Sequence, residues 1–213
     1  LNPEGFLTQA GFGRLVATLP DPELFDKRFG EMRKHGQQSH DRLALDYSPD
    51  LPLAPEWHEF VAELNGEAYS KFLARMFGRG ALRLVFHWHY TPNGCSVSPH
   101  CDARRKLGSH IFYFNTEENW QPEWGGETLI LDDGGRFPAS SAPKFEDFQR
   151  IMPAAAIGNR SLLFMRREQS WHGVREIQCP PAALRKVFIV VIEDWSVPAR
   201  LINLARGGKR MRA

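Results

Sequence analysis

The spacing of apolar residues changes near residue 80, and this change limits the fold of the 213-residue chain more than any other feature. Before Gly80, apolar residues recur three or four apart, which is typical of amphipathic helices, and the clearest case covers residues 55–77. From Ala81 onward, short segments rich in Val, Ile, Phe, Leu and Tyr alternate with turn residues such as Pro92-Asn93-Gly94. The sequence therefore predicts a mainly β protein preceded by helices.

Two shorter helices are expected before the clearest one. They cover residues 8–19 and 23–33 and are separated by Pro20-Asp21-Pro22. Eight strands are expected after them, over residues 82–90, 95–102, 108–115, 127–132, 135–138, 160–166, 170–177 and 184–194. Short strands without intervening helices favour a sandwich or jelly roll, with the helices covering one sheet.

The same change of pattern suggests a division of the chain. We expect a dependent helical layer over residues 1–80, a β core over 81–198 and a basic tail over 199–213. Hydrophobic residues make up 42% of the chain and the formal net charge is +2, as in ordinary soluble domains. A dedicated nucleic-acid binder usually carries a larger basic excess, so a nucleic-acid partner is not expected. The oligomeric state is left open.

The cysteines and the first residues bear on the compartment. Cys95, Cys101 and Cys179 are odd in number and lack CxxC spacing, which does not fit a disulfide framework or a structural zinc site. The first residues lack the pattern of a signal peptide, and no run of about 18 apolar residues occurs. A cytoplasmic location without a membrane span is therefore expected.

One strand-like segment carries a histidine and an aspartate two residues apart. Because alternate residues of a strand share a face, His100 and Asp102 can present an imidazole and a carboxylate side by side. His172, 72 residues after His100, can complete the set from another strand. Two imidazoles and one carboxylate leave open positions on a metal, which suits a non-haem Fe(II) that binds a chelating cosubstrate and dioxygen. Arg185, at the start of the last strand, could bind a carboxylate with its planar guanidinium.

Several motifs occur in a fixed order with this set. They are YTPNG at 90–94, HCD at 100–102, SHIFYFN at 109–115, GGETLIL at 125–131, then His172 and Arg185. Together they resemble the Fe(II)/2-oxoglutarate-dependent dioxygenases, in the branch of the prolyl hydroxylases, over roughly residues 82–195. The resemblance implies a double-stranded β-helix, a cupin-like jelly roll, flanked by α-helices.

The resemblance also implies roles for individual residues. His100, Asp102 and His172 would bind Fe(II), and Arg185 would bind the C5 carboxylate of the cosubstrate 2-oxoglutarate. Tyr113 would add a hydroxyl to that carboxylate, and Tyr90 would line the same pocket. O2 would be the oxidant, and ascorbate is an additional candidate cofactor. The implied reaction is hydroxylation of an aliphatic C–H bond in a peptidyl or small polar substrate, with release of succinate and CO2.

Three alternatives stay open at this stage. Lys186 is a rival of Arg185 for the carboxylate, because the spacing from His172 is longer than usual. His87 and His89 form an HxH pair that would suit a cupin-type metal-dependent hydrolase or isomerase. If Tyr90 points into the barrel, these two histidines point away from it. A module that binds 2-oxoglutarate without turnover is the third alternative.

Basic and aromatic residues are expected around the mouth of the site. The basic residues expected there would attract an acidic substrate. They are Arg104, Arg105, Lys106, Arg166, Arg167 and Arg175. Trp120 and Trp124, in the loop before the Gly-Gly strand, would form either a lid beside the pocket or the packing of that loop.

Overall fold

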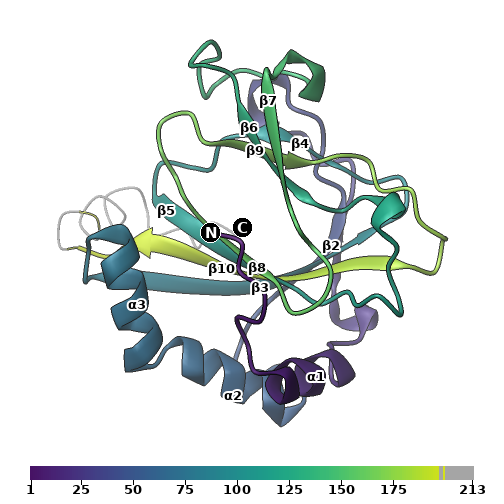
Figure 1. Cartoon of the computed structure of the whole chain (residues 1–213), viewed down its shortest axis with the longest axis vertical. Helices are drawn as coiled ribbons and strands as arrows, with labels where there is room; N and C mark the ends of the chain where they lie inside the picture. The colour runs from purple at the N-terminus through teal and green to yellow at the C-terminus, as the bar shows by residue number, and fades with distance from the viewer. Residues whose placement is uncertain (197–198, 200–213) are drawn as a thin grey trace.

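Two antiparallel β-sheets form the centre of the molecule (Figure 1). The computed structural model describes residues 1–196 and 199. The larger sheet has the order β1-β2-β3-β10-β5-β8. Its strands are β1 (Asp26–Arg28), β2 (Arg42–Asp46), β3 (Leu82–Pro92), β10 (Leu184–Asp194), β5 (Lys106–Tyr113) and β8 (Ser161–Met165). The smaller sheet, ordered β4-β9-β6-β7, contains β4 (Val97–His100), β9 (Trp171–Val174), β6 (Thr128–Asp132) and β7 (Arg150–Ala154).

In the described part of the chain, three α-helices cover the outer face of the larger sheet, on the side away from the smaller one (Figure 1). They are α1 (Gln9–Ala17), α2 (Pro55–Leu64) and α3 (Glu67–Phe77). Short 3-10 helices occupy Pro22–Leu24, Lys34–Gly36, Pro122–Trp124 and Phe145–Asp147. The core between helices and sheet is aromatic, with Trp57, Trp88 and Phe188 fully buried and in mutual contact. Helices that cover a double-stranded β-helix agree with the predicted fold class.

The helices differ from the sequence prediction in two places. The segment 55–77 is two helices rather than one, because the chain turns at Asn65 and Gly66, where the Gly66 amide donates to the Glu63 carbonyl at 2.9 Å. The predicted helix over 23–33 is wrong: this segment forms a 3-10 turn and the edge strand β1. Phe25, Phe29 and Met32 keep helical spacing, but Gly30 has a φ of +66°, which a right-handed helix does not allow.

The strands agree in part. The predicted segments that cover β3, β4, β5, β6, β8, β9 and β10 are strands, whereas 135–138 is not. Here the Asp133 carboxylate accepts hydrogen bonds from the amides of Gly135 and Phe137, at 3.0 and 2.6 Å, and holds a turn. Sequence analysis did not predict strand β7, because it is an exposed edge strand that contains Pro153.

Strands β1 and β2 also escaped prediction, and they change the picture of residues 1–80. Both strands extend the larger sheet beyond β3, so this part of the chain supplies two strands as well as the helical layer. Strand β2 thereby brings its side chains to the inner side of the sheet, beside those of β3. The predicted basic tail lies outside the described residues apart from Ala199. Among the described helices, none has the length and apolar character needed to cross a bilayer.

Candidate metal and cosubstrate site

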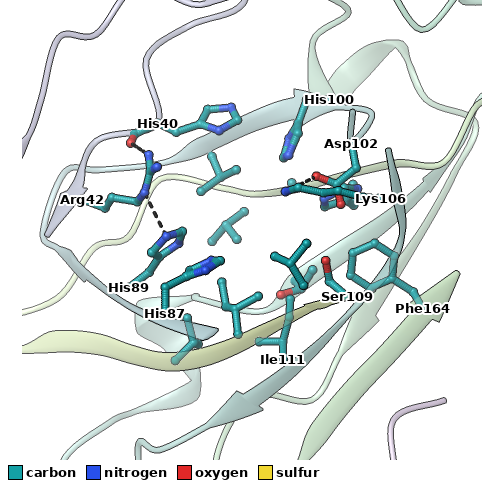
Figure 2. A pocket seen from close by; sticks show the side chains of 18 of the residues that line it. His40, Arg42, His87, His89, His100, Asp102, Lys106, Ser109, Ile111 and Phe164 are labelled. Atoms are coloured by element: carbon teal, nitrogen blue, oxygen red, sulfur yellow. Dashed lines mark hydrogen bonds and ion pairs between the residues drawn. The ribbon is translucent and has the colours of Figure 1, made fainter. Parts of the chain in front are cut away.

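A cavity of about 320 Å³ lies between the inner faces of the two sheets. Strands β2, β3, β5, β8 and β10 line it from the larger sheet, and β4, β6 and β9 line it from the smaller one. Figure 2 shows His100 and Asp102 on one side of the cavity and His87 and His89 on the other. The sheets thus bring together residues that are distant in sequence.

Three of the predicted ligands meet at this cavity. Strands β4 and β9 pair so that His100 lies opposite His172, and their ring centroids are 4.3 Å apart. Asp102 follows directly after β4, and each of the three side chains offers one ligand atom within 4.8 Å of the others. The structure therefore places the three predicted metal ligands in one cluster.

Backbone contacts orient both imidazoles. His100 Nδ1 lies 3.0 Å from the Ser98 carbonyl oxygen, and His172 Nδ1 lies 3.1 Å from that of Ser170. Because a carbonyl only accepts, each Nδ1 carries the proton and each Nε2 keeps its lone pair for a metal. Burial lowers the pKa of both histidines, so both are neutral at pH 7. Neutral imidazole is the form that binds a metal ion.

The carboxylate of Asp102 is held in its ionised form. Lys106 Nζ donates to Asp102 Oδ1 at 2.9 Å, and Arg166 Nε donates to the Asp102 carbonyl oxygen at 2.9 Å. Burial alone would raise the pKa of Asp102, but the positive charge of Lys106 and its hydrogen bond to the carboxylate lower that pKa below its ordinary value. Two neutral imidazoles and a carboxylate are the donor set of a non-haem Fe(II) site, so the residues present fit this metal.

Arg185 lies inside the same cavity, with 6% of its surface exposed. Its Nε donates to the Gly126 carbonyl at 2.5 Å, and its Nη2 donates to Thr128 Oγ1 at 3.2 Å. Burial lowers the pKa of Arg185, but an arginine keeps its proton in proteins. Gly126 has a φ of +97°, and a Cβ there would lie 3.2 Å from Arg185 Cδ. A glycine at this position thus allows the arginine to pack closely.

Two other residues predicted as candidates for cosubstrate binding, Tyr113 and Lys186, lie in different positions relative to Arg185. Tyr113 is 1% exposed, donates to Thr128 Oγ1 at 2.8 Å and packs against the Arg185 guanidinium, which lies 5.7 Å from its ring centroid. Lys186 is paired with Tyr90 in the register of β10 and β3 and does not line the cavity. Alternation along β10 instead sends Arg185, Val187 and Ile189 inward.

The expectation that Tyr90 lines this pocket is wrong. Tyr90 points to the helical side of the larger sheet, where its ring stacks on Phe25 at 4.2 Å and its hydroxyl donates to the Pro20 carbonyl at 3.1 Å. By the same alternation, His87 and His89 point inward and line the cavity. Among the described residues, the one group of three potential metal ligands does not include them.

The loop tryptophans and the basic residues have separate outcomes. Trp120 is 2% exposed and packs with Ile177 and Val174. Neither Trp120 nor Trp124 lines the cavity, so the two tryptophans contribute to packing of the loop and do not form a lid. Of the basic residues, Arg105 and Lys106 line the cavity, whereas Arg175 pairs with Glu146 at 3.0 Å. Arg104 and Arg167 are exposed.

Three further residues of the cavity were missed by sequence analysis: Arg33, His40 and Arg42. The ring of His40 lies 4.5 Å from that of His100, and its Nε2 lies 3.1 Å from Ser98 Oγ. Arg42 lies on β2, in whose sequence RLALD the two leucines, Leu43 and Leu45, are two residues apart. This spacing was the signal that could have identified a strand with Arg42 on the face opposite the leucines.

Comparison with known proteins decides the family. The model of the 2OG-Fe(II) oxygenase superfamily matches residues 86–192, which is half of the chain. The chain belongs to this superfamily. It is therefore an oxygenase that depends on Fe(II) and 2-oxoglutarate, with O2 as the usual co-substrate. No curated protein matches the chain.

Solved structures with the same fold include two prolyl hydroxylases and a protein named HygX. A Pseudomonas putida prolyl-4-hydroxylase is 15% identical, with a TM-score of 0.60 and 91% of each chain covered. A Trichoplax adhaerens prolyl hydroxylase in complex with a peptide fragment is 15% identical, with a TM-score of 0.61 and coverage of 95% and 86%. HygX from Streptomyces hygroscopicus, with nickel and 2-oxoglutarate bound, is 12% identical, with a TM-score of 0.60 and coverage of 91% and 82%. At these identities the likeness concerns the fold of the oxygenase.

Proposed function

We propose that this oxygenase hydroxylates an aliphatic C–H bond of a small polar or peptidyl substrate, and that His100, Asp102 and His172 hold its iron. The observation that carries the proposal is the cluster of three ligand atoms within 4.8 Å at the cavity wall. When bound, Fe(II) would supply the activation of dioxygen that couples the conversion of 2-oxoglutarate to succinate and CO2 with oxidation of the substrate.

The chain's own residues would orient the metal ligands and exclude water from the site. The Ser98 and Ser170 carbonyls fix the tautomers of the two histidines, so that both Nε2 atoms face the metal position. Lys106 keeps Asp102 ionised and holds one of its oxygens. The apolar floor of Ile111, Phe164 and Val187 would keep water away from the reacting centre.

Arg185 would bind the C5 carboxylate of 2-oxoglutarate. Its guanidinium is buried and donates to the Gly126 carbonyl and the Thr128 hydroxyl rather than to an acidic side chain. A buried arginine without a carboxylate is well suited to a charged ligand, because binding would supply the missing counter-charge. Tyr113 would act through Thr128, whose hydroxyl it orients by donating a hydrogen bond.

The size of the cavity favours a small group at the reacting position. A volume of about 320 Å³ is near the lower end for ligand pockets, and 2-oxoglutarate would occupy part of it. The structural neighbours include HygX with hygromycin B bound and a prolyl hydroxylase with a peptide bound. Either a small molecule or one side chain of a peptide fits this space.

Three free cysteines favour a reducing, cytoplasmic compartment.

Anaerobic titration with Fe(II) and 2-oxoglutarate tests the proposal. The protein should develop a visible metal-to-ligand charge-transfer band, and admission of O2 should yield succinate. His100→Ala should lose the band, whereas His35→Asn, at an exposed position with a φ of +62° that asparagine tolerates, should keep it.

Two outcomes would count against the proposal. Absence of the band in the unmodified protein, together with metal binding that survives His100→Ala, would favour the cupin-type alternative. A normal band without succinate, across a broad panel of substrates, would favour a module that binds 2-oxoglutarate without turnover.

A further inference from the structure

His87 and His89 face the cavity, yet neither the proposed iron site nor the proposed cosubstrate site uses them. Both lie on β3, and their ring centroids are 4.6 Å apart. His87 is 2% exposed, and His89 is partly open to the cavity. Figure 2 shows the two rings across the cavity from Asp102 and Lys106. They form a wall that is separate from the three clustered ligands.

Arg42 fixes the proton of His89. Arg42 Nε donates to His89 Nε2 at 3.2 Å, and Arg42 Nη1 donates to the His40 carbonyl at 2.7 Å (Figure 2). A nitrogen that accepts a hydrogen bond carries no proton, so neutral His89 carries its proton on Nδ1. Burial lowers the pKa of His89 well below its ordinary value, and the histidine is therefore neutral at pH 7. Its Nδ1–H is then a donor of fixed position.

His87 supplies a second polar group. Its Nδ1 is buried and has no hydrogen-bond partner in the protein. Buried polar atoms in native proteins nearly always have a hydrogen-bond partner, and a buried atom without one destabilises the fold. A ligand group or a water molecule at this wall of the cavity would supply the partner.

The charge of the cavity indicates the sign of that ligand. Arg33, Arg42, Arg105, Lys106 and Arg185 line it, and Asp102 is the single acidic residue in the described lining. Asp102 is already paired with Lys106, and Glu193, which lies outside the lining, pairs with Arg105 at 2.8 Å, so the net charge of these groups stays positive. In a cavity of low dielectric constant this excess of positive charge favours an anionic group.

We infer that His87 and His89 form a subsite for a carboxylate of the primary substrate. The inference rests on the proposed function, because this subsite shares the cavity with the proposed iron and 2-oxoglutarate positions. A carboxylate has two acceptor oxygens and one charge, which suits two neutral imidazoles beside Arg42. A phosphate monoester carries about two charges and three strong acceptor oxygens, more than two imidazoles can satisfy.

The test measures binding of acetate to the protein loaded with Zn(II), a redox-inert substitute for iron, and saturating 2-oxoglutarate. Ligand-observed NMR should detect saturable binding of acetate with a Kd on the order of 1–10 mM, within the limit for a ligand of this size. Acetamide, which has the same shape without the charge, should bind about 10-fold more weakly or worse. Inorganic phosphate should bind more weakly than acetate.

Variants locate the binding. His89→Leu should weaken acetate binding about 10- to 100-fold, the range for one hydrogen bond to a charged group. His89→Asn keeps an N–H donor near the Nδ1 position and should stay within about threefold of the unmodified protein. His35→Asn, outside the cavity, is the control and should not change the Kd.

Four results would overturn the inference. They are equal binding of acetate and acetamide, tighter binding of phosphate than of acetate, no acetate binding, and acetate binding that His89→Leu does not change. The comparison of acetate with acetamide needs no variant and stands if His89→Leu does not fold. A charge-transfer band that forms normally with Fe(II), together with failure to bind acetate, would reject the subsite and leave the proposed function standing. Absence of the band would reject the proposed function instead.

Discussion

At the residue scale, the phase of one strand decides which charge faces the cavity. Arg185 and Lys186 are adjacent in sequence, but alternation along β10 turns one inward and the other toward the helices. The arginine carries two parallel donors, whereas a lysine presents a point charge. The structure thus separates two residues that the sequence presents as rivals for the same carboxylate.

Substitution at these two positions should therefore differ in effect. Arg185→Met should raise the KM for 2-oxoglutarate about 100-fold or more, because loss of a buried charge that binds a carboxylate costs about 2–5 kcal/mol. Lys186→Met should leave this KM within about threefold. Succinate formation at varied 2-oxoglutarate measures both, and thermal unfolding shows whether each variant is folded. A larger effect at Lys186 would contradict the proposed role of Arg185.

At the element scale, strand β3 shows where sequence reasoning succeeded and where it failed. Sequence analysis identified β3 as a strand, but its polar side, which carries His87 and His89, faces the cavity, and polarity alone does not distinguish an internal cavity from solvent. Tyr90 and His89 were therefore assigned in the wrong phase. The prediction for the HxD pair avoided this error of strand phase, because Asp102 follows the end of β4 and its position depends on the loop. Strands β1, β2 and β7 were missed, since none is longer than five residues and β1 and β7 lie at the edges of their sheets.

The docking of helix α2 on the larger sheet depends on Trp57. This side chain is fully buried, contacts the rings of Trp88, Phe114 and Phe188, and donates from Nε1 to the Thr18 carbonyl at 2.8 Å. Trp57→Ala should lower the free energy of unfolding by about 3–5 kcal/mol, the usual cost of a large cavity. Urea unfolding measures the change.

A control on the neighbouring helix has a much smaller expected effect. Lys71→Ala removes an exposed ion pair to Glu67 and should cost less than about 0.5 kcal/mol. If Trp57→Ala destabilised the protein no more than Lys71→Ala, helix α2 would not be held by this contact.

At the scale of the whole molecule, buried histidines make stability depend on pH. Burial lowers the pKa of six histidines: His40, His87, His89, His100, His110 and His172. For His40, His87 and His110 the pKa falls to about 3, while an unfolded chain has a histidine pKa of about 6.5. Between these values the unfolded state binds more protons, so the folded state loses stability as pH falls. The stability is fully present above pH 6.5.

His110 allows this dependence to be tested away from the cavity. Its Nδ1 lies 2.9 Å from the Tyr69 hydroxyl in the helix-covered core, and its ring packs edge-on against Phe6 at 4.8 Å. Glutamine at this position keeps a hydrogen-bonding group but does not titrate. Below about pH 6, His110→Gln should therefore reduce the slope of unfolding free energy against pH by about 1.4 kcal/mol per pH unit. Urea unfolding from pH 8 to pH 4.5, with a metal chelator present, measures the slope.

The matched control for this experiment is Ser70→Ala, a neutral change at an exposed position on the same helix as Tyr69. It should shift the unfolding free energy equally at every pH and leave the slope unchanged, because no titrating group is removed. His110→Gln and the unmodified protein should also converge in slope above pH 7, where the histidine is neutral in both the folded and the unfolded state. Equal slopes below pH 6 would mean that His110 takes up its proton in the folded protein, and that its burial does not contribute to acid unfolding.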